Sequence, residues 1–284
     1  FTNNLSQFMF GTDNDTLSKY LSTKFQDGEH FIIPQTDKNG IILISVILII
    51  NCVSGGDFFK TGNIPPEAKQ FHSIMLNLIK GSPELESQDT NDLILFTNTY
   101  VDSLNKCDIC LGISYWDTTF REFMMENTTY FYKAIYDVFK HKQVISSSVL
   151  NIFNHLHTNP WFQELNNKKL LIISKNANEI ESQVNSIYLK DLYNFDIFSN
   201  CDFGFIKFLS WDCDTKEKIS KQISKYDIAL CDCGVYGSII SNYVFNTCGS
   251  SVIDIGDILP MYFGCWKTKD LQKYKDIIQL YLNE

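Results

Sequence analysis

The second half of the chain alternates short apolar runs with segments in which apolar residues recur at helical spacing. The apolar runs, which predict strands, are Lys168 to Ser174, Phe203 to Leu209, Ile228 to Cys231 and Ser251 to Ile255. The helical segments are Asn178 to Leu189, Asp214 to Lys225, a stretch beginning at Ile239, and Leu271 to Leu282. Strands that alternate with helices pair in parallel and are covered by helices. The pattern therefore predicts an α/β, Rossmann-like fold with a largely parallel sheet and helices on both faces.

The first half of the chain is dominated by helical spacing. The predicted elements are a helix that starts at Pro65 and Pro66, a helix from Leu93 to Asn105, a strand from Cys107 to Ile113 and a helix from Thr119 to Phe139. The most hydrophobic stretch, Ile41 to Val53, is shorter than the roughly 20 residues that a membrane helix needs. We expect this stretch to be a buried helix or strand, and we expect no transmembrane segment.

A glycine loop joins one predicted strand directly to a predicted helix. The strand from Ile228 to Cys231 is followed by Gly234, Tyr236 and Gly237, and helical spacing resumes at Ile239. A strand-to-helix junction of this kind directs backbone N–H groups and the positive end of a helix dipole at one point, and glycine lets a ligand come close. The loop is a candidate phosphate site. The alternative is an ordinary turn of an α/β fold, because short glycine motifs are weak evidence.

Polar and glycine residues follow several predicted strands. In open parallel sheets, ligands bind at the carboxyl ends of the strands. The residues expected there are Asp13 and Asp15, Trp116 and Asp117, Ser174 and Lys175, Gly234 and Gly237, and Gly256 and Asp257.

The first of these pairs is a candidate metal site. Asp13 and Asp15 follow an apolar triplet and Gly11, so we expect them at a strand end. Two carboxylates at this spacing in a tight turn can share one hard divalent cation. The alternative is that the Asp and Asn residues here cap a helix from Leu17 to Phe25.

Composition and charge limit the class of protein. The 284 residues include 44% hydrophobic and 14% aromatic residues, which is typical of a globular chain with a full core. The formal net charge of -9 argues against a general nucleic-acid binder, because phosphate contacts need clustered Lys and Arg. An anionic ligand would have to be held by a local device such as a metal ion or a helix terminus.

The nine cysteines are scattered and odd in number, which favours a reducing compartment, and we expect a cytoplasmic protein. The pairs Cys107/Cys110 and Cys231/Cys233 lack a second pair at metal-site spacing, so we interpret them as buried thiols. His155 and His157 lack a third ligand and are expected to be surface or packing residues. The chain begins at Phe1, so an upstream signal stays open, and we treat residues 1–284 as a single domain or a piece of a longer protein.

Several segments, taken in order, resemble one family. Residues 159–174, which contain Pro160-Trp161 and Leu170-Leu171-Ile172-Ile173-Ser174, are similar to a pattern of Pro-Trp followed by Leu-x-Gly-Lys-Lys-Val-Leu-Val-Ile-Ser. Residues 226–237 are similar to Asp-Ile-Ala-Leu-x-x-Cys-Gly-Ala-Tyr-Gly, and residues 252–264 to a strand followed by Gly-Gly-Ala-Leu-Gln-x-x-Phe-Gly. Residues 51–59 and 10–15 resemble Asn-Asn-Ala-Gly-Phe-Phe and Phe-Gly-Asp-Gly-Glu. The family is the GT-D type of glycosyltransferase domain, found in enzymes that build surface polysaccharides and glycoproteins.

The resemblance implies metal-dependent transfer of a sugar from a nucleotide-sugar donor to a glycan or glycoprotein acceptor. The family's acidic D-x-E pair falls on Asp13 and Asp15, which would bind Mn²⁺ or Mg²⁺ and so neutralise a diphosphate leaving group. Its glycine loop falls on Gly234, Tyr236 and Gly237, which would hold phosphate or ribose. Gly11 and Gly256 border these elements and are included as candidate binding residues.

This sequence departs from the family pattern at three places. The second acid of the pair is Asp15, Lys175-Asn176 replaces Pro-Phe, and Asp257 replaces the second glycine of Gly-Gly-Ala. These departures leave the donor open. Candidates for the general base are Asp257, which we favour as a catalytic residue, and Asp57, Asp117 and Glu122.

Two other classes stay open. A dinucleotide-dependent enzyme would use the same junction, but the G-x-x-G spacing lacks a third glycine, and only Asp254 stands where an acidic residue is expected about 20 residues later. The second class is a binding module that has lost catalytic activity.

Overall fold

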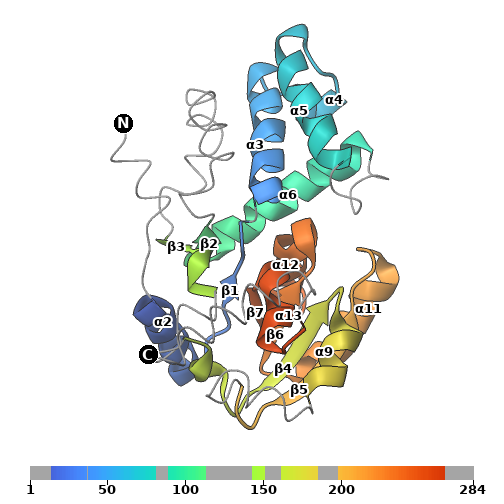
Figure 1. Cartoon of the computed structure of the whole chain (residues 1–284). Helices are drawn as coiled ribbons and strands as arrows, with labels where there is room; N and C mark the ends of the chain where they lie inside the picture. The colour runs from blue at the N-terminus through green and yellow to red at the C-terminus, as the bar shows by residue number, and fades with distance from the viewer. Residues whose placement is uncertain are drawn as a thin grey trace, which may run out of the picture. The chain divides into compact units, whose positions relative to one another are not determined.

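The structure is a computed structural model that describes residues 14–36, 38–80, 89–112, 143–150, 161–184 and 198–265 (Figure 1). The chain divides into two compact units. Unit 1 comprises residues 1–12, 30–147 and 234–254, and unit 2 comprises residues 13–29, 148–233 and 255–284. The chain therefore passes back and forth between the two units, and each is built from separate stretches of sequence.

Unit 2 is built on three parallel strands. β4 (Lys169–Ser174) pairs on one side with β5 (Asp202–Lys207) and on the other with β6 (Ile228–Asp232). Every residue of β6, and every residue of β4 after the first, is buried, as expected for strands covered on both faces. The last residues of β4 and β6, Ser174 and Asp232, are direct partners in the register. The carboxyl ends of these strands thus meet at one edge.

The helices of unit 2 lie around these strands. α9 (Ala177–Val184) follows β4 and packs against β4 and β5 (Figure 1). The other α-helices are α2 (Asn14–Asp27), α11 (Cys213–Gln222) and α13 (Leu259–Tyr262). The described part of the unit also contains short 3-10 helices: η3 (Ser147–Leu150, which starts at its border), η5 (Trp161–Leu165), η6 (Ile223–Lys225) and η8 (Gly256–Ile258).

In its described residues, unit 1 contains several helices and two parallel strand pairs. β1 (Ile32–Ile33) pairs with β7 (Ser251–Asp254), and β2 (Ile109–Gly112) pairs with β3 (Gln143–Ser146). The helices are α3 (Lys38–Val53), α4 (Phe58–Thr61), η1 (Pro66–Ala68), α5 (Lys69–Lys80), α6 (Thr90–Lys106), η7 (Gly234–Tyr236) and α12 (Gly237–Asn246). An Asp89–Asp92 capping box starts α6. α12 packs on β7 and β1.

The predicted fold class is confirmed. The chain is α/β, all the described strand pairs are parallel, and helices flank the strands. Most predicted elements fall within a few residues of the observed ones. The predicted strand from Cys107 begins later, at Ile109, because Cys107 ends α6 as its C-cap. The predicted helices at Thr119 to Phe139 and Leu271 to Leu282 lie outside the described residues.

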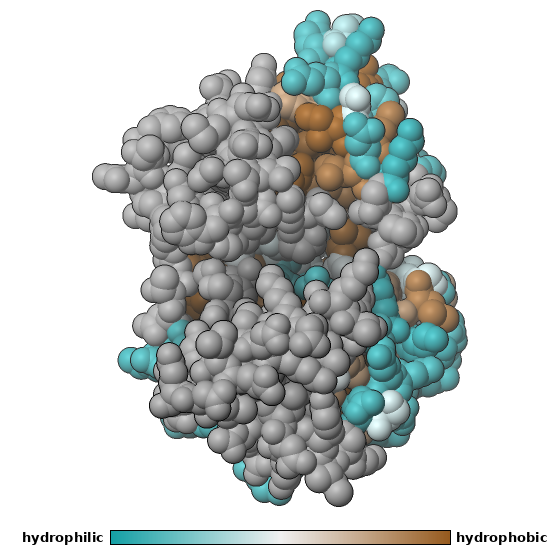
Figure 2. Space-filling view, viewed as in Figure 1, coloured by the Kyte–Doolittle hydropathy of each residue, from teal (hydrophilic) through white to brown (hydrophobic). Residues whose placement is uncertain are grey.

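The hydrophobic stretch from Ile41 to Val53 belongs to α3, and its residues from Ile41 to Ile50 are buried except for the half-buried Leu48. Among the helices that the structure describes, none has both the length and the apolar character needed to span a bilayer. Hydrophilic residues gather at the tips of the described helices drawn uppermost in Figure 2, and apolar residues lie along their sides. Two leucines of these helices, Leu76 and Leu95, are exposed.

An aromatic cluster forms the core of unit 2 beside the strands. Its members, which meet edge to face or tilted at centroid distances of 5.4 to 6.4 Å, are Trp161, Phe162, Phe198, Tyr262 and Phe263. The polar atoms of this cluster are paired: Trp161 Nε1 donates to the Val149 carbonyl at 3.1 Å, and the Tyr262 hydroxyl donates to the Leu150 carbonyl at 2.5 Å. Burial raises the pKa of the Tyr262 hydroxyl far above its usual range.

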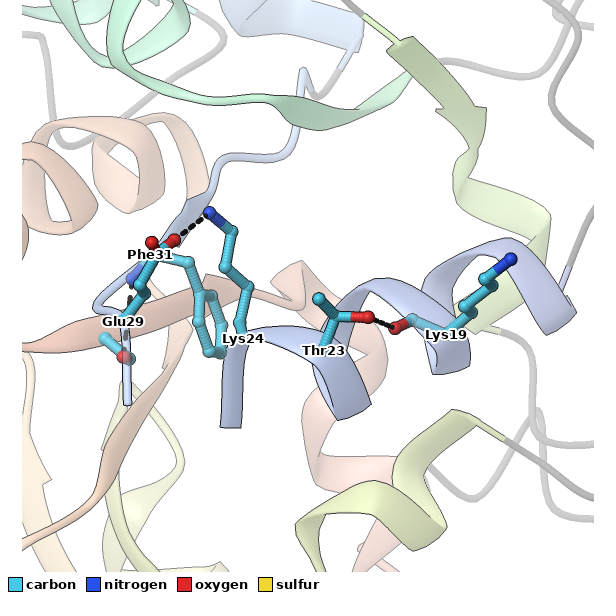
Figure 3. A network of polar contacts seen from close by, with 6 residues as sticks. Lys19, Thr23, Lys24, Glu29 and Phe31 are labelled. Atoms are coloured by element: carbon cyan, nitrogen blue, oxygen red, sulfur yellow. Dashed lines mark hydrogen bonds and ion pairs between the residues drawn. The ribbon is translucent and has the colours of Figure 1, made fainter. Parts of the chain in front are cut away.

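Helix α2 is fixed to this cluster by two hydrogen bonds. The Trp161 backbone N–H donates to Asn14 Oδ1 at 2.8 Å, and the Ser18 hydroxyl donates to Glu164 Oε1 at 2.7 Å. Lys24, near the end of the helix, forms an ion pair with Glu29, which lies just beyond it, at 2.7 Å (Figure 3). The helix that carries Asp15 in its first turn is therefore anchored on η5.

We predict that Trp161→Ala lowers the free energy of unfolding by about 3–5 kcal/mol, because it removes a wholly buried indole and leaves a cavity among four rings. Trp161→Phe should cost less, since the ring contacts persist and mainly the hydrogen bond to Val149 is lost. Urea denaturation followed by circular dichroism would measure both changes. A loss below 1 kcal/mol for the alanine variant would contradict this view of the core.

Candidate functional site

A polar cluster lies at the carboxyl edge of β4 and β6. The Ser174 hydroxyl donates to Asp232 Oδ2 at 2.8 Å, and Asn176 Nδ2 donates to the same oxygen at 3.3 Å. The Asn176 backbone N–H donates to Ser174 Oγ at 2.9 Å, which orients the serine O–H toward Asp232. The Lys175 N–H donates to the Asp232 carbonyl at 3.3 Å. The turn after β4 is thus fastened to the last residue of β6.

The carboxyl group of Asp232 is in an unfavourable place for a charge. Its residue is 4% exposed, and burial raises the pKa of this carboxyl above its usual range. The hydrogen bonds from Ser174 and Asn176 oppose the rise, the nearby charge of Asp257 adds to it, and Lys175 opposes it. A carboxyl group whose pKa is shifted upward at the ligand-binding edge of a parallel sheet is a candidate acid or base.

Asp257, a predicted catalytic residue, lies in η8 and is exposed. The charge of Asp257 contributes to the raised pKa of Asp232, and the charge of Lys175 opposes it, so both residues lie near enough to the polar cluster to act on it. Gly256 begins η8 in a left-handed conformation with φ of 66° and is buried, so glycine is required there by the backbone turn. Three positions where the sequence departs from the GT-D pattern therefore act on one carboxylate, Asn176 through a hydrogen bond and Lys175 and Asp257 through their charges.

The glycine loop forms as predicted, with η7 and α12 directly after β6. Gly234 has φ of 56°, a left-handed conformation that favours glycine. Gly237, the first residue of α12, has another constraint: a Cβ built on it would overlap the carboxylate of Asp254, the last residue of β7. The close approach that glycine permits is that of the protein's own carboxylate, which lies against the start of the helix, where the dipole stabilises negative charge. The phosphate role of the loop stays a prediction.

Tyr236 is 6% exposed, and its ring meets the edge of Phe96 at 5.5 Å. The residue packs in unit 1, and most of its surface is unavailable to a ligand in this conformation.

Asp15 lies in the first turn of α2 and is exposed. The strand expected before Asp15 lies outside the described residues and stays a prediction, whereas Asp15 itself is helical, and the helix predicted from Leu17 to Phe25 begins earlier, at Asn14. Its expected metal partner Asp13, together with Gly11, lies outside the described residues. Within the parts of the chain that the structure describes, no three His, Cys, Asp or Glu side chains come close enough to hold a metal ion.

The other sequence candidates are dispersed or outside the description. Asp57 is the exposed N-cap residue of α4 in unit 1. The residues that lie outside the described ranges are Trp116, Asp117, Glu122, His155 and His157. All nine cysteines are free thiols, and Cys107, Cys110, Cys231 and Cys233 are buried, as predicted.

Sequence reasoning missed Asp232. It stands within the glycine-loop segment, where attention went to Gly234 and Gly237. The available signal was a charged residue directly after a fully apolar run, Ile228 to Cys231.

We predict that Gly237→Ala lowers the free energy of unfolding by about 1–3 kcal/mol, because the added methyl group overlaps the Asp254 carboxylate. In the double variant Gly237→Ala/Asp254→Ala the overlap is gone, so the combined loss should be smaller than the sum of the single losses. Urea denaturation of the four proteins measures this coupling. Additive losses would show that the two positions do not collide.

We predict that Asp232→Asn is better tolerated at neutral than at acidic pH. A carboxyl group whose pKa is raised by folding contributes stability below its unfolded pKa of about 3.9, and this contribution is lost as the pH rises through the folded value. The stability of the asparagine variant minus that of the wild type should therefore increase between about pH 4 and pH 7. Denaturant titrations at the two pH values test this, and a difference that falls with pH would contradict the raised pKa.

Comparison with known proteins gives one match. No curated protein and no solved structure matches the chain. The family described as the GT-D fold-like domain matches residues 98–262, more than half of the chain. The match includes Ser174, Asp232, the glycine loop and Asp257, whereas Asp13 and Asp15 precede it. With parallel strands, a glycine loop and a polar edge where this domain is matched, the chain belongs to the GT-D-like family.

Proposed function

We propose that the protein is a glycosyltransferase that moves a sugar from a nucleotide-sugar donor to a hydroxyl group of a glycan or glycoprotein acceptor. The observation that carries this proposal is the family match, whose span holds a polar cluster at the carboxyl edge of β4 and β6. The edge is where open parallel sheets bind ligands. The same edge offers a carboxylate suited to accept a proton from an acceptor hydroxyl.

The donor's diphosphate needs positive charge from elsewhere, because the chain is acidic overall, with a formal net charge of -9. In this proposal Asp13 and Asp15 would hold Mn²⁺ or Mg²⁺, which would supply positive charge beside the leaving diphosphate. The residues support this role through their resemblance to the family's acidic pair and through the anchoring of α2, which begins at Asn14, on η5. Lys175 is a second source of positive charge near the strand edge.

The loop of Gly234 and Gly237 would bind the nucleotide end of the donor through backbone N–H groups. The carboxylate of Asp254 lies at the same helix start, so a phosphate would have to bind farther along the loop, toward Gly234, or with a cation between the two anions. This arrangement favours a metal-assisted donor over a bare phosphate ligand.

We predict that incubation with a panel of nucleotide-sugars yields Mn²⁺- or Mg²⁺-dependent release of nucleoside diphosphate. Asp13→Asn/Asp15→Asn should reduce this release by at least about tenfold, because the metal loses two charged ligands. Asp27→Asn, at the other end of α2, is the matched control and should leave it unchanged.

Different outcomes would reject the metal-site role of Asp13 and Asp15 and the transferase activity. Release that persists in the double variant would reject the acidic pair as the metal site while keeping the transferase. Binding of nucleotide-sugar by calorimetry without any release would instead favour a nucleotide-binding module that has lost catalysis.

A further inference from the structure

The Ser174–Asn176–Asp232 cluster has one fixed and one open carboxylate oxygen. Both side-chain hydrogen bonds to Asp232 end on Oδ2. Within the described residues, Oδ1 accepts no hydrogen bond. A carboxylate held by one oxygen keeps a defined orientation and leaves the other oxygen able to accept a hydrogen bond.

If the cluster had only a structural role, burying the Asp232 carboxylate would lower the stability of the fold. Asp232 is nearly buried, and its side chain is held by two neutral donors with no ion pair among the described residues. Burying a carboxylate in this way disfavours its charged form. A well-hydrogen-bonded neutral residue would serve the fold better, which is the usual sign of a residue kept for activity.

The chain of hydrogen bonds that leads to Asp232 resembles the one that holds a general base in a fixed orientation. The Asn176 N–H donates to Ser174 Oγ, and Ser174 donates in turn to Asp232 Oδ2. A base held by a second group that is itself held by a third is the arrangement that catalysis of proton transfer needs. The charged groups acting on this carboxylate are Asp257 and Lys175, one of each sign.

We infer that Asp232 is the general base of the transfer reaction and that Ser174 and Asn176 are its positioning residues. This inference rests on the proposed function. Asp232 Oδ1 takes the proton of the acceptor hydroxyl while the acceptor oxygen forms a bond to the anomeric carbon of the donor. The bond between that carbon and the diphosphate oxygen breaks, and its electron pair leaves with the diphosphate.

The test is the transfer rate of Asp232→Asn, with the donor identified from the panel and an acceptor sugar present. An amide cannot take the proton, so kcat should fall by about 10²–10⁴-fold. The affinity for nucleoside diphosphate, measured by calorimetry, should stay within about twofold, because Asp232 contacts the acceptor hydroxyl. The matched control is Asp227→Asn, just before the amino end of the same strand, where the carboxylate accepts from the Lys169 N–H at 2.8 Å. It should retain wild-type kcat.

A second variant tests the base independently of its removal. Ser174→Ala deletes a hydrogen bond that holds the pKa of Asp232 down, so the acidic limb of the kcat–pH profile should move to higher pH. A merely structural serine would lower kcat or stability without moving this limb. If Asp232→Asn does not fold, this profile decides the assignment.

The outcomes separate the two proposals. Wild-type kcat in Asp232→Asn, or an unmoved acidic limb in Ser174→Ala, overturns the base assignment and leaves the transferase intact. Absence of turnover by the wild type with every donor overturns the proposed function and the base assignment with it.

Discussion

The register between β4 and β6 is the constraint on which the candidate site depends. Parallel pairing aligns Ser174 with Asp232 at the ends of two buried strands, and a shift of one strand by one residue would turn its side chain to the opposite face from its partner. The short turn after β4 then needs only two residues to bring Asn176 to the same carboxylate. The backbone hydrogen bonds of the sheet thus fix a side-chain arrangement that no local sequence motif could specify.

The fold was predictable because its signals are local. Periodicity identified β4, β6 and α12 within a few residues, and their alternation implied parallel pairing. At Asp15 the local signals left two possibilities open. A short polar stretch after an apolar triplet fits either a strand end or a helix start, and contacts of Asn14 and Ser18 with η5, far along the chain, select the helix.

The site was only partly predictable. The sequence indicates that another group packs closely against Gly237, but it does not indicate which group. That group is Asp254, which lies on another strand and reaches the glycine only in the folded chain. Asp232 was missed for the same reason. Its partners are separated from it by 56 and 58 residues, and a carboxylate at the end of an apolar run has no meaning until register places a serine opposite it. Residue types suggest which chemistry is possible, whereas the pairing of distant strands determines which residues come together in one site.

The interleaving of the two units has a consequence for how the chain folds. Unit 2 takes its strands from residues 148–233 and its closing segment from residue 255 onward, while residues 234–254 belong to unit 1. Tyr262 can join the rings of Trp161 and Phe162 only after the intervening stretch has left one unit and returned. Such contacts require a large loss of chain entropy for loop closure before they stabilise the fold. Folding should therefore be slow and cooperative. Neither unit corresponds to a single uninterrupted piece of polypeptide, and during synthesis the aromatic core must wait, incomplete, until residues beyond α12 emerge.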